Sequence, residues 1–283
     1  MLLRGALMAL CLLATTPIAA AQEHPSSDGE ALADLRVAEG ERDISAAWLI
    51  APTTRYQHFV LGSDYEAGGL RVLLASGEVL TLMLDDQHVF EDRQPRLADV
   101  DGDGHDEIVL VLSSLTQGAS LAVYGVAEDA LVLEAKTPFI GRPSRWLNPA
   151  GLADFDGDGQ IDIAFVAMPH LVKRLEVWTM AGTGLRQIAT VDDVSNHRLG
   201  SQHIGMAATG DFDGNGIADL AVPDGARAVL RLIGLAGGNP SEIARLPLEG
   251  RSDGAIMAAP SAIGWTFRVP LEAGHTVRLA YPD

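Results

Sequence analysis

Short apolar runs alternate with turn residues along the chain from Ser45 onward. Residues 70–74 and 79–84 flank Ser76 and Gly77, a pattern that predicts a β-hairpin. The same rhythm predicts further strands at residues 108–112, 120–126, 131–135, 161–167, 174–180, 185–191, 220–223, 228–233 and 242–248. No long segment has the period of an amphipathic helix. The predicted fold class is therefore all-β.

An internal repeat organises this pattern. Residues 97–108, 152–163 and 209–220 align without gaps, and their first acids recur at intervals of about 55 residues. A period of this length has room for about four strands and their turns, which predicts one propeller blade per repeat. Residues 45–94 and 251–283 resemble further copies that lack the acids.

The predicted architecture is a β-propeller of five four-stranded blades, with seven blades, some of them degenerate, as the alternative. The expected boundaries are a signal peptide at residues 1–21, a leader at 22–44 and the propeller at 45–283. The last unit is one strand short, so residues 31–37 are expected to supply a strand that closes the ring.

Each repeat contains an acidic loop with oxygen-bearing side chains at relative positions 1, 3, 5 and 9. These candidate ligands are Asp99, Asp101, Asp103 and Glu107, then Asp154, Asp156, Asp158 and Asp162, then Asp211, Asp213, Asn215 and Asp219. Position 7 varies between His105, Gln160 and Ile217, as expected where only the backbone carbonyl is a ligand. Position 6 is always glycine, which allows the sharp reversal of a loop that surrounds an ion.

This set of ligands favours Ca²⁺. Calcium binds six to eight hard oxygens at about 2.3–2.6 Å in a tolerant geometry, whereas Mg²⁺ requires a stricter octahedron. The loops have no thiol and no regular histidine spacing, which argues against zinc and copper. Without a cation, the carboxylates of one loop would repel each other. About three Ca²⁺ ions are therefore expected.

Two other interpretations of the loops exist. Acidic, glycine-rich segments also make good hairpin turns, but three copies in register favour the ion. A helix-loop-helix calcium site needs Glu at position 12 of its loop. That position holds Leu110, Phe165 and Val222, each inside an apolar run typical of a strand.

The motif Asp-x-Asp-Gly-Asp/Asn-Gly-x-x-Asp/Glu resembles the FG-GAP or VCBS-type repeat, which is also found in the propellers of integrin α-chains. The resemblance is strong over residues 95–250 and weak at 45–94 and 251–283. It implies a β-propeller whose blades each hold one Ca²⁺ in the loop between their first two strands. The integrin-type propeller has seven blades, and this chain is short for seven.

Charge restricts the possible partners. The formal net charge is −18, with 38 acidic and 20 basic residues and no basic run. A nucleic acid or an anionic membrane surface is therefore not expected as a partner. No stretch of 18 apolar residues follows the N-terminal segment, so no transmembrane segment is expected.

The N-terminal segment has the features of a secretory signal. Arg4 precedes a short apolar run at residues 5–13, and Ala19 and Ala21 supply the small residues of a cleavage site. The expected location is outside the cytoplasm, either periplasmic or secreted. Cys11 is the only cysteine, so the mature chain would have no disulfide.

No catalytic motif stands out. The three Gly-x-Gly pairs lack the third glycine of a dinucleotide site, and no P-loop, Gly-x-Ser-x-Gly or His-Glu-x-x-His sequence occurs. Two polar clusters, Asn196 to Arg198 with His203, and Arg142 with Arg145 and Trp146, fit either a functional propeller face or ordinary turns.

The sequence favours a non-enzymatic, exported, calcium-binding β-propeller that binds a protein or a glycan. A polysaccharide lyase or glycoside hydrolase built on the propeller and a purely structural envelope protein are the alternatives.

Overall fold

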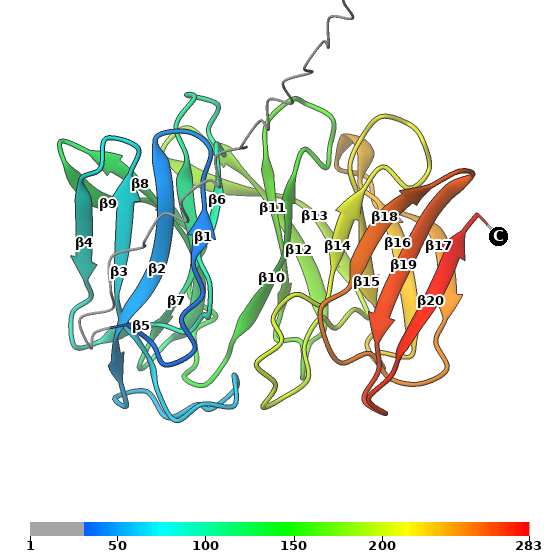
Figure 1. The fold of residues 1–283 in the computed structure, drawn as a ribbon, viewed down its shortest axis with the longest axis horizontal. Coiled ribbons are helices and arrows are strands. Elements are labelled where there is room, and N and C mark those ends of the chain that lie inside the picture. The colour runs from blue at the N-terminus through cyan, green and yellow to red at the C-terminus, as the bar shows by residue number, and fades with distance from the viewer. Residues whose placement is uncertain (1–30, 283) are drawn as a thin grey trace, which may run out of the picture.

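The computed structural model describes residues 31–282. Within these residues, twenty strands form four antiparallel sheets, and one short 3₁₀ turn, η1 (Ala236–Gly238), lies between two of the strands. The all-β prediction is therefore confirmed. In Figure 1 the sheets follow one another from β1–β9 at the left to β18–β20 at the right. The predicted signal peptide and Cys11 lie outside the described residues. No helix among residues 31–282 is long and apolar enough to span a membrane.

The first sheet has nine strands. Their bounds are β1 (Ala38–Glu39), β2 (Ile44–Thr53), β3 (Glu66–Leu74), β4 (Val79–Met83), β5 (His88–Phe90), β6 (Arg96–Ala98), β7 (Glu107–Ser114), β8 (Gly118–Ala127) and β9 (Ala130–Lys136). The sheet contains two meanders, β1–β4 and β6–β9. Strand β5 joins them because it pairs with both β3 and β7.

Two four-stranded sheets and one three-stranded sheet follow. The second sheet consists of β10 (Leu147–Ala153), β11 (Asp162–Ala167), β12 (Arg174–Ala181) and β13 (Gly184–Asp192). The third consists of β14 (Ala208–Gly210), β15 (Asp219–Pro223), β16 (Val229–Gly234) and β17 (Ser241–Pro247). The fourth consists of β18 (Met257–Ser261), β19 (Gly264–Pro270) and β20 (Thr276–Tyr281).

Seven apolar runs of the sequence become middle strands, namely β3, β7, β8, β11, β12, β15 and β16, and four others become the last strands β4, β9, β13 and β17. All eight residues of β7 are buried, whereas most residues of the last strand, β13, in the second sheet are partly or fully exposed. Burial of a strand on both faces requires a continuous apolar run rather than an alternating pattern. The sequence pattern therefore identified the strands that lie inside the stack.

The hydrophobic core lies between consecutive meanders. Most of its clusters combine residues of one meander with residues of the next, whereas a small cluster around Trp48 lies within the first meander. Examples that share a cluster are Val111 with Phe165, Val177 with Val222, and Leu232 with Phe267. Stacking of sheets face to face removes this apolar surface from water and holds the loops at the strand ends in fixed positions.

The N-terminal segment pairs within the first sheet. Ala38 and Glu39 lie opposite Ala47 and Ala46 of β2, and Ala31 forms an isolated bridge with Ile50. Within the part of the chain that the structure describes, no pairing joins residues 31–37 to β18–β20. The segment expected to close a ring thus extends the first meander, and ring closure stays a prediction.

Candidate metal centre

Three acidic loops occupy the same place in three consecutive meanders, between the first strand and the second. They connect β6 to β7, β10 to β11 and β14 to β15. In each, the residue at position 9 starts the second strand and pairs with the residue before position 1. These pairs are Ala98 with Glu107, Ala153 with Asp162 and Gly210 with Asp219. The strand register therefore brings positions 1 and 9 together at the mouth of each loop.

The carboxylate at position 1 organises the turn of each loop. Asp99 accepts the backbone N–H of Gly102 on Oδ1 (2.8 Å) and that of Gly104 on Oδ2 (3.1 Å). Asp154 and Asp211 make the same pair of bonds in the second and third loops. Gly104 has a φ of 95°, a conformation that glycine adopts without steric cost. The sharp reversal expected from the sequence is thus present.

The acid at position 9 is buried in all three loops. Asp219 accepts the N–H of Phe212 on Oδ2 at 2.7 Å, and Asp162 accepts that of Phe155 at 3.0 Å. The other oxygen, Oδ1, of both Asp162 and Asp219 is buried and has no hydrogen-bonding partner within residues 31–282. A buried carboxylate oxygen without a partner is costly unless a cation or a proton neutralises it.

The pKa values of these buried acids reflect that cost. Burial, opposed by the N–H of Val100 and reinforced by Asp101, raises the pKa of Glu107 to about 7. Burial is also the main reason why the pKa values of Asp162 and Asp219 rise to about 6. The charge of Asp156 adds to the effect at Asp162, and that of Asp213 adds to it at Asp219. A bound cation would remove the same penalty by stabilising the ionised form.

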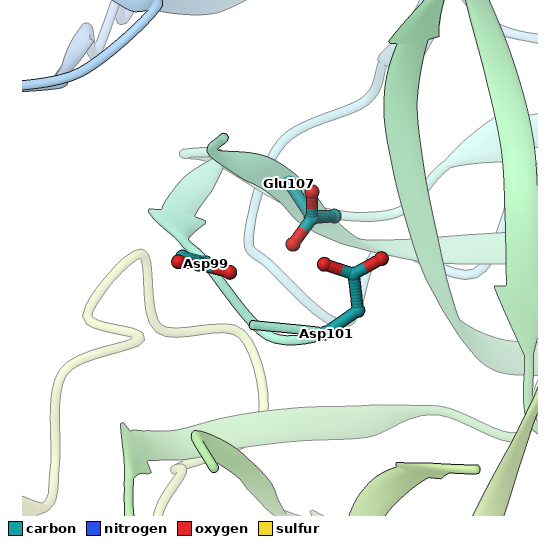
Figure 2. A group of neighbouring side chains, drawn as sticks. All are labelled: Asp99, Asp101 and Glu107. Atoms are coloured by element: carbon teal, nitrogen blue, oxygen red, sulfur yellow. The ribbon is translucent and has the colours of Figure 1, made fainter. Parts of the chain in front are cut away.

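Each loop gathers three carboxylates around one point. One oxygen each from Asp99, Asp101 and Glu107 lies within 4.8 Å of the others, and the second and third loops form equivalent groups. Those groups are Asp154 with Asp156 and Asp162, and Asp211 with Asp213 and Asp219. Figure 2 shows the carboxylates of Asp101 and Glu107 facing each other, with Asp99 on the far side of the loop. The arrangement offers hard oxygens only, which fits a divalent cation such as Ca²⁺.

The side chains at position 5 lie outside these groups of three. The oxygens of Asp103, Asp158 and Asn215 accept the backbone N–H of position 7, at 2.7–2.9 Å. Ligation by position 5, and by the carbonyl at position 7, stays a prediction.

The side chains at position 7 turn away from the acids. His105 lies with Nδ1 at 3.3 Å from Oδ2 of Asp43. The side chain of Ile217 lies against Gly157, so close that a Cβ atom at Gly157 would meet it at 2.7 Å. Position 7 can therefore vary, because its side chain serves contacts outside its own loop.

No sequence motif points to Glu134, which lies close enough to the first loop to be affected by the charges of two of its acids. It lies on β9, and burial together with the charges of Asp101 and Asp103 raises its pKa. Glu134 belongs to the last strand of its meander, far from the acidic loop in the chain, so no local motif contains it.

The two polar clusters of the sequence lie elsewhere and have mainly structural contacts. Nδ2 of Asn196 donates to the carbonyls of Asn148 and Pro149, and Nε1 of Trp146 donates to the carbonyl of Glu91. A cavity of about 460 Å³ lies between β1, β6 and β10. His197 lines a different cavity of about 450 Å³ at the far ends of the strands.

Comparison with known families agrees with the loops. Residues 154–222 match the FG-GAP-like repeat, a segment that runs from Asp154 of the second acidic loop to Val222 beyond the third. No curated protein matches the chain. The chain therefore contains an FG-GAP-like repeat, which supports its assignment as an FG-GAP/VCBS-type repeat protein.

Proposed function

We propose that this protein is an exported, calcium-binding β-propeller that acts as a binding module for a protein or a glycan. Each of the five meanders would be one blade, and one Ca²⁺ would occupy each acidic loop. The calcium ions are structural in this proposal, because the loops join strands inside each meander.

The observation that carries the proposal is the buried, unpartnered Oδ1 of Asp162 and of Asp219. Both acids belong to the groups of three carboxylates, and both are almost fully buried. Hairpin turns built only for their geometry do not need a buried acid at that position, since a neutral side chain would avoid the desolvation cost.

The ligands in the first loop would be Asp99, Asp101 and Glu107, completed by further oxygens of the same loop and by water. Bound calcium supplies two positive charges that offset the mutual repulsion of the carboxylates. An ion present at about 1,000 times its dissociation constant stabilises the folded state by roughly 4 kcal/mol per independent site. Three such sites would take the place of disulfides.

Export and ligand binding rest on other features. The N-terminal sequence resembles a secretory signal, and no cysteine follows Cys11. Calcium loops of this kind suit a compartment with millimolar Ca²⁺. A rigid stack of meanders leaves the connecting loops free to form a recognition surface.

Thermal unfolding with and without calcium tests the structural role. We expect EGTA to lower the melting temperature by ten degrees or more, about what a loss of several kcal/mol implies for a chain of this size. Added Ca²⁺ should restore it, and Mg²⁺ at the same concentration should restore it less. A melting temperature that neither EGTA nor Ca²⁺ changes would refute the proposal.

A further inference from the structure

A second site lies at the opposite ends of the strands from the acidic loops. The acidic loop joins the end of β10 to the start of β11, so the segments before β10 and after β11 lie at the other end. The same holds for β14 and β15. Here a cavity of about 450 Å³ is lined by residues of three segments, among them His170, Lys173, His197, Arg198, Leu199 and Arg227, together with Arg251.

The cavity is strongly basic in a strongly acidic protein. Lys173, Arg198, Arg227 and Arg251 line it, and its lining includes no carboxylate. The chain has only 20 lysines and arginines against 38 acids. Cations that are not offset by an ion pair make a local positive field, which here would oppose the charge of the molecule as a whole.

Two of these cations are fixed and two are unpaired. Nε of Arg198 lies 2.7 Å from Oδ2 of Asp253, and Nη2 of Arg227 lies 2.5 Å from Oε1 of Glu272. No carboxylate within residues 31–282 lies within 4.0 Å of the charged groups of Lys173 or Arg251. Nζ of Lys173 is instead held by the carbonyl of Gly225 at 2.5 Å. Two positive charges are thus available to a ligand.

The histidines that line the cavity add no positive charge to it. Nε2 of His170 lies 3.0 Å from Nδ1 of His197, whose Nε2 donates to the carbonyl of Ser201. Burial, together with the positive charges of Arg227 and Lys173, lowers the pKa of His170 to about 4, and burial lowers that of His197 to about 3. Both rings are therefore neutral at pH 7, and the field of the cavity is set by its lysine and arginines.

An apolar cavity of about 180 Å³ adjoins the basic one. It is lined by Trp146, Met168 and Leu171 among others, and it shares His170 and Leu199 with the basic cavity. Leu171 and Leu199, whose side chains are 62% and 61% exposed, both line this cavity and offer apolar surface to a ligand. A ligand that fills both cavities would place an anionic group beside an apolar group.

The surroundings favour a peptide over a sugar. Sugar rings are commonly held against an exposed aromatic face, but Trp146 is only 3% exposed and is covered by the ring of His170. Its Nε1 is already bonded to the carbonyl of Glu91. Small apolar space beside unpaired cations suits an aliphatic side chain next to a carboxylate.

We infer that this pair of cavities binds an acidic peptide segment, with a carboxylate in the basic cavity and a neighbouring aliphatic side chain between Leu171 and Leu199. The inference rests on the proposed function as a binding module and names its ligand class.

A peptide array on the full-length mature protein tests the inference. Acetylated heptapeptides with two Asp or Glu residues around one Leu, Ile or Phe would be compared with their Asn and Gln counterparts in 1 mM Ca²⁺. The acidic peptides should bind, the amide forms should not, and binding should weaken as salt rises. Equal binding of both series, or binding of neither, would overturn the inference.

Matched variants then locate the site. With the best peptide in isothermal titration calorimetry, Arg251→Glu and Leu199→Ser should each reduce affinity at least tenfold. Arg268→Glu and Ile263→Ser, exposed positions on the last sheet, should leave it unchanged. Loss of affinity in the controls alone, or preferential binding of an oligogalacturonate that depends on Arg251, would contradict an acidic peptide as the ligand.

The calcium dependence of the melting temperature is measured in parallel on each variant. A normal calcium response with no peptide binding would overturn this inference while leaving calcium binding intact. Loss of the calcium response in wild-type protein would instead refute the proposed function.

Discussion

The backbone N–H of Phe212 donates to Oδ2 of Asp219 at 2.7 Å, while Oδ1 of the same carboxylate is buried without a partner within residues 31–282. Oδ2 of Asp219 therefore holds the backbone of the loop in place, whereas Oδ1 has no hydrogen bond that offsets its desolvation. The same division occurs at Asp162. The acid at position 9 fixes the conformation of the loop, but its ionised form has no neutralising partner there. A bound cation would stabilise that ionised form.

Replacing that acid by its neutral amide separates the two roles. Asp219→Asn keeps an oxygen for the N–H of Phe212 but removes the charge. In EGTA, we expect the variant to have a higher melting temperature than wild type. Added Ca²⁺ should raise the melting temperature of the variant by about a third less than that of wild type, because one of three sites is lost. Differential scanning fluorimetry measures both, with the exposed Asp129→Asn as control. A calcium response equal to that of wild type would exclude Asp219 as a ligand.

A change at position 3 tests whether each loop is its own site. Asp156→Ala removes one carboxylate of the second group and should abolish one site while leaving the other two largely intact. Calorimetry should then count two calcium ions instead of three. The second and third loops touch, because Ala218 donates its N–H to the carbonyl of Asp154 at 3.3 Å. Loss of two sites would show that this contact couples them.

The last sheet supports the third loop from outside. Nε1 of Trp265 donates to the carbonyl of Asp211 at 2.8 Å, and its ring meets that of Phe212 edge to face. Trp265→Phe removes the bond and should cost about 1 kcal/mol, which corresponds to a melting temperature lower by about 2–4 °C.

The control for this change is Trp146→Phe, because Nε1 of Trp146 also donates to a backbone carbonyl, that of Glu91 at 2.8 Å, and Trp146 directly precedes β10, at the end opposite the acidic loop. We also expect Trp265→Phe to weaken calcium binding at one site, measured by titration, and Trp146→Phe to leave it unchanged. Equal effects of the two substitutions would mean that the last sheet does not support the third loop.

Local patterns explain how much of this structure could be predicted from the sequence. The hairpin of β3 and β4 and the buried strand β7 were visible as apolar runs, because a middle strand is apolar along its whole length. The acidic loops were visible because their acids lie within nine consecutive residues. In the structure, one oxygen from each of three acids of a loop lies within 4.8 Å of the others, and their role as ligands stays a prediction.

Features that depend on distant partners were not visible. Strands β6 and β14 have three residues each and become strands only through pairing with β7 and β15. Strand β5 joins two meanders into one sheet through a single pair, Ala67 with Phe90, on the side of β3. Glu134, on β9, comes near the charges of the first loop only in the folded chain. Each of these depends on tertiary contacts that no local periodicity encodes.

Glu66 gives a prediction on pH that does not involve the loops. It is buried at the start of β3, and its Oε2 has no hydrogen-bonding partner among the residues described. Burial, with the nearby charge of Glu91, raises its pKa to about 9. The unfolded chain releases this proton near pH 4.5, whereas the folded protein keeps it up to about pH 9. Rising pH across that window therefore lowers the free energy of unfolding.

Glu66→Gln removes this titration and should stabilise the protein more at pH 8 than at pH 5. The difference in the free energy of unfolding between variant and wild type should grow by up to about 1.4 kcal/mol for each unit of rising pH. Urea unfolding at both pH values in 1 mM Ca²⁺ measures it, with the exposed Glu78→Gln as control. A constant difference between variant and wild type would show that Glu66 is ionised in the folded protein.

The number of calcium ions bound by the mature protein tests the central claim most directly. Isothermal titration calorimetry of metal-stripped protein with CaCl₂ should give a stoichiometry of three, with one site lost in Asp219→Asn and another in Asp156→Ala. Heats no greater than those of dilution, or a stoichiometry of three that persists in both variants, would contradict the assignment of the acidic loops as calcium sites.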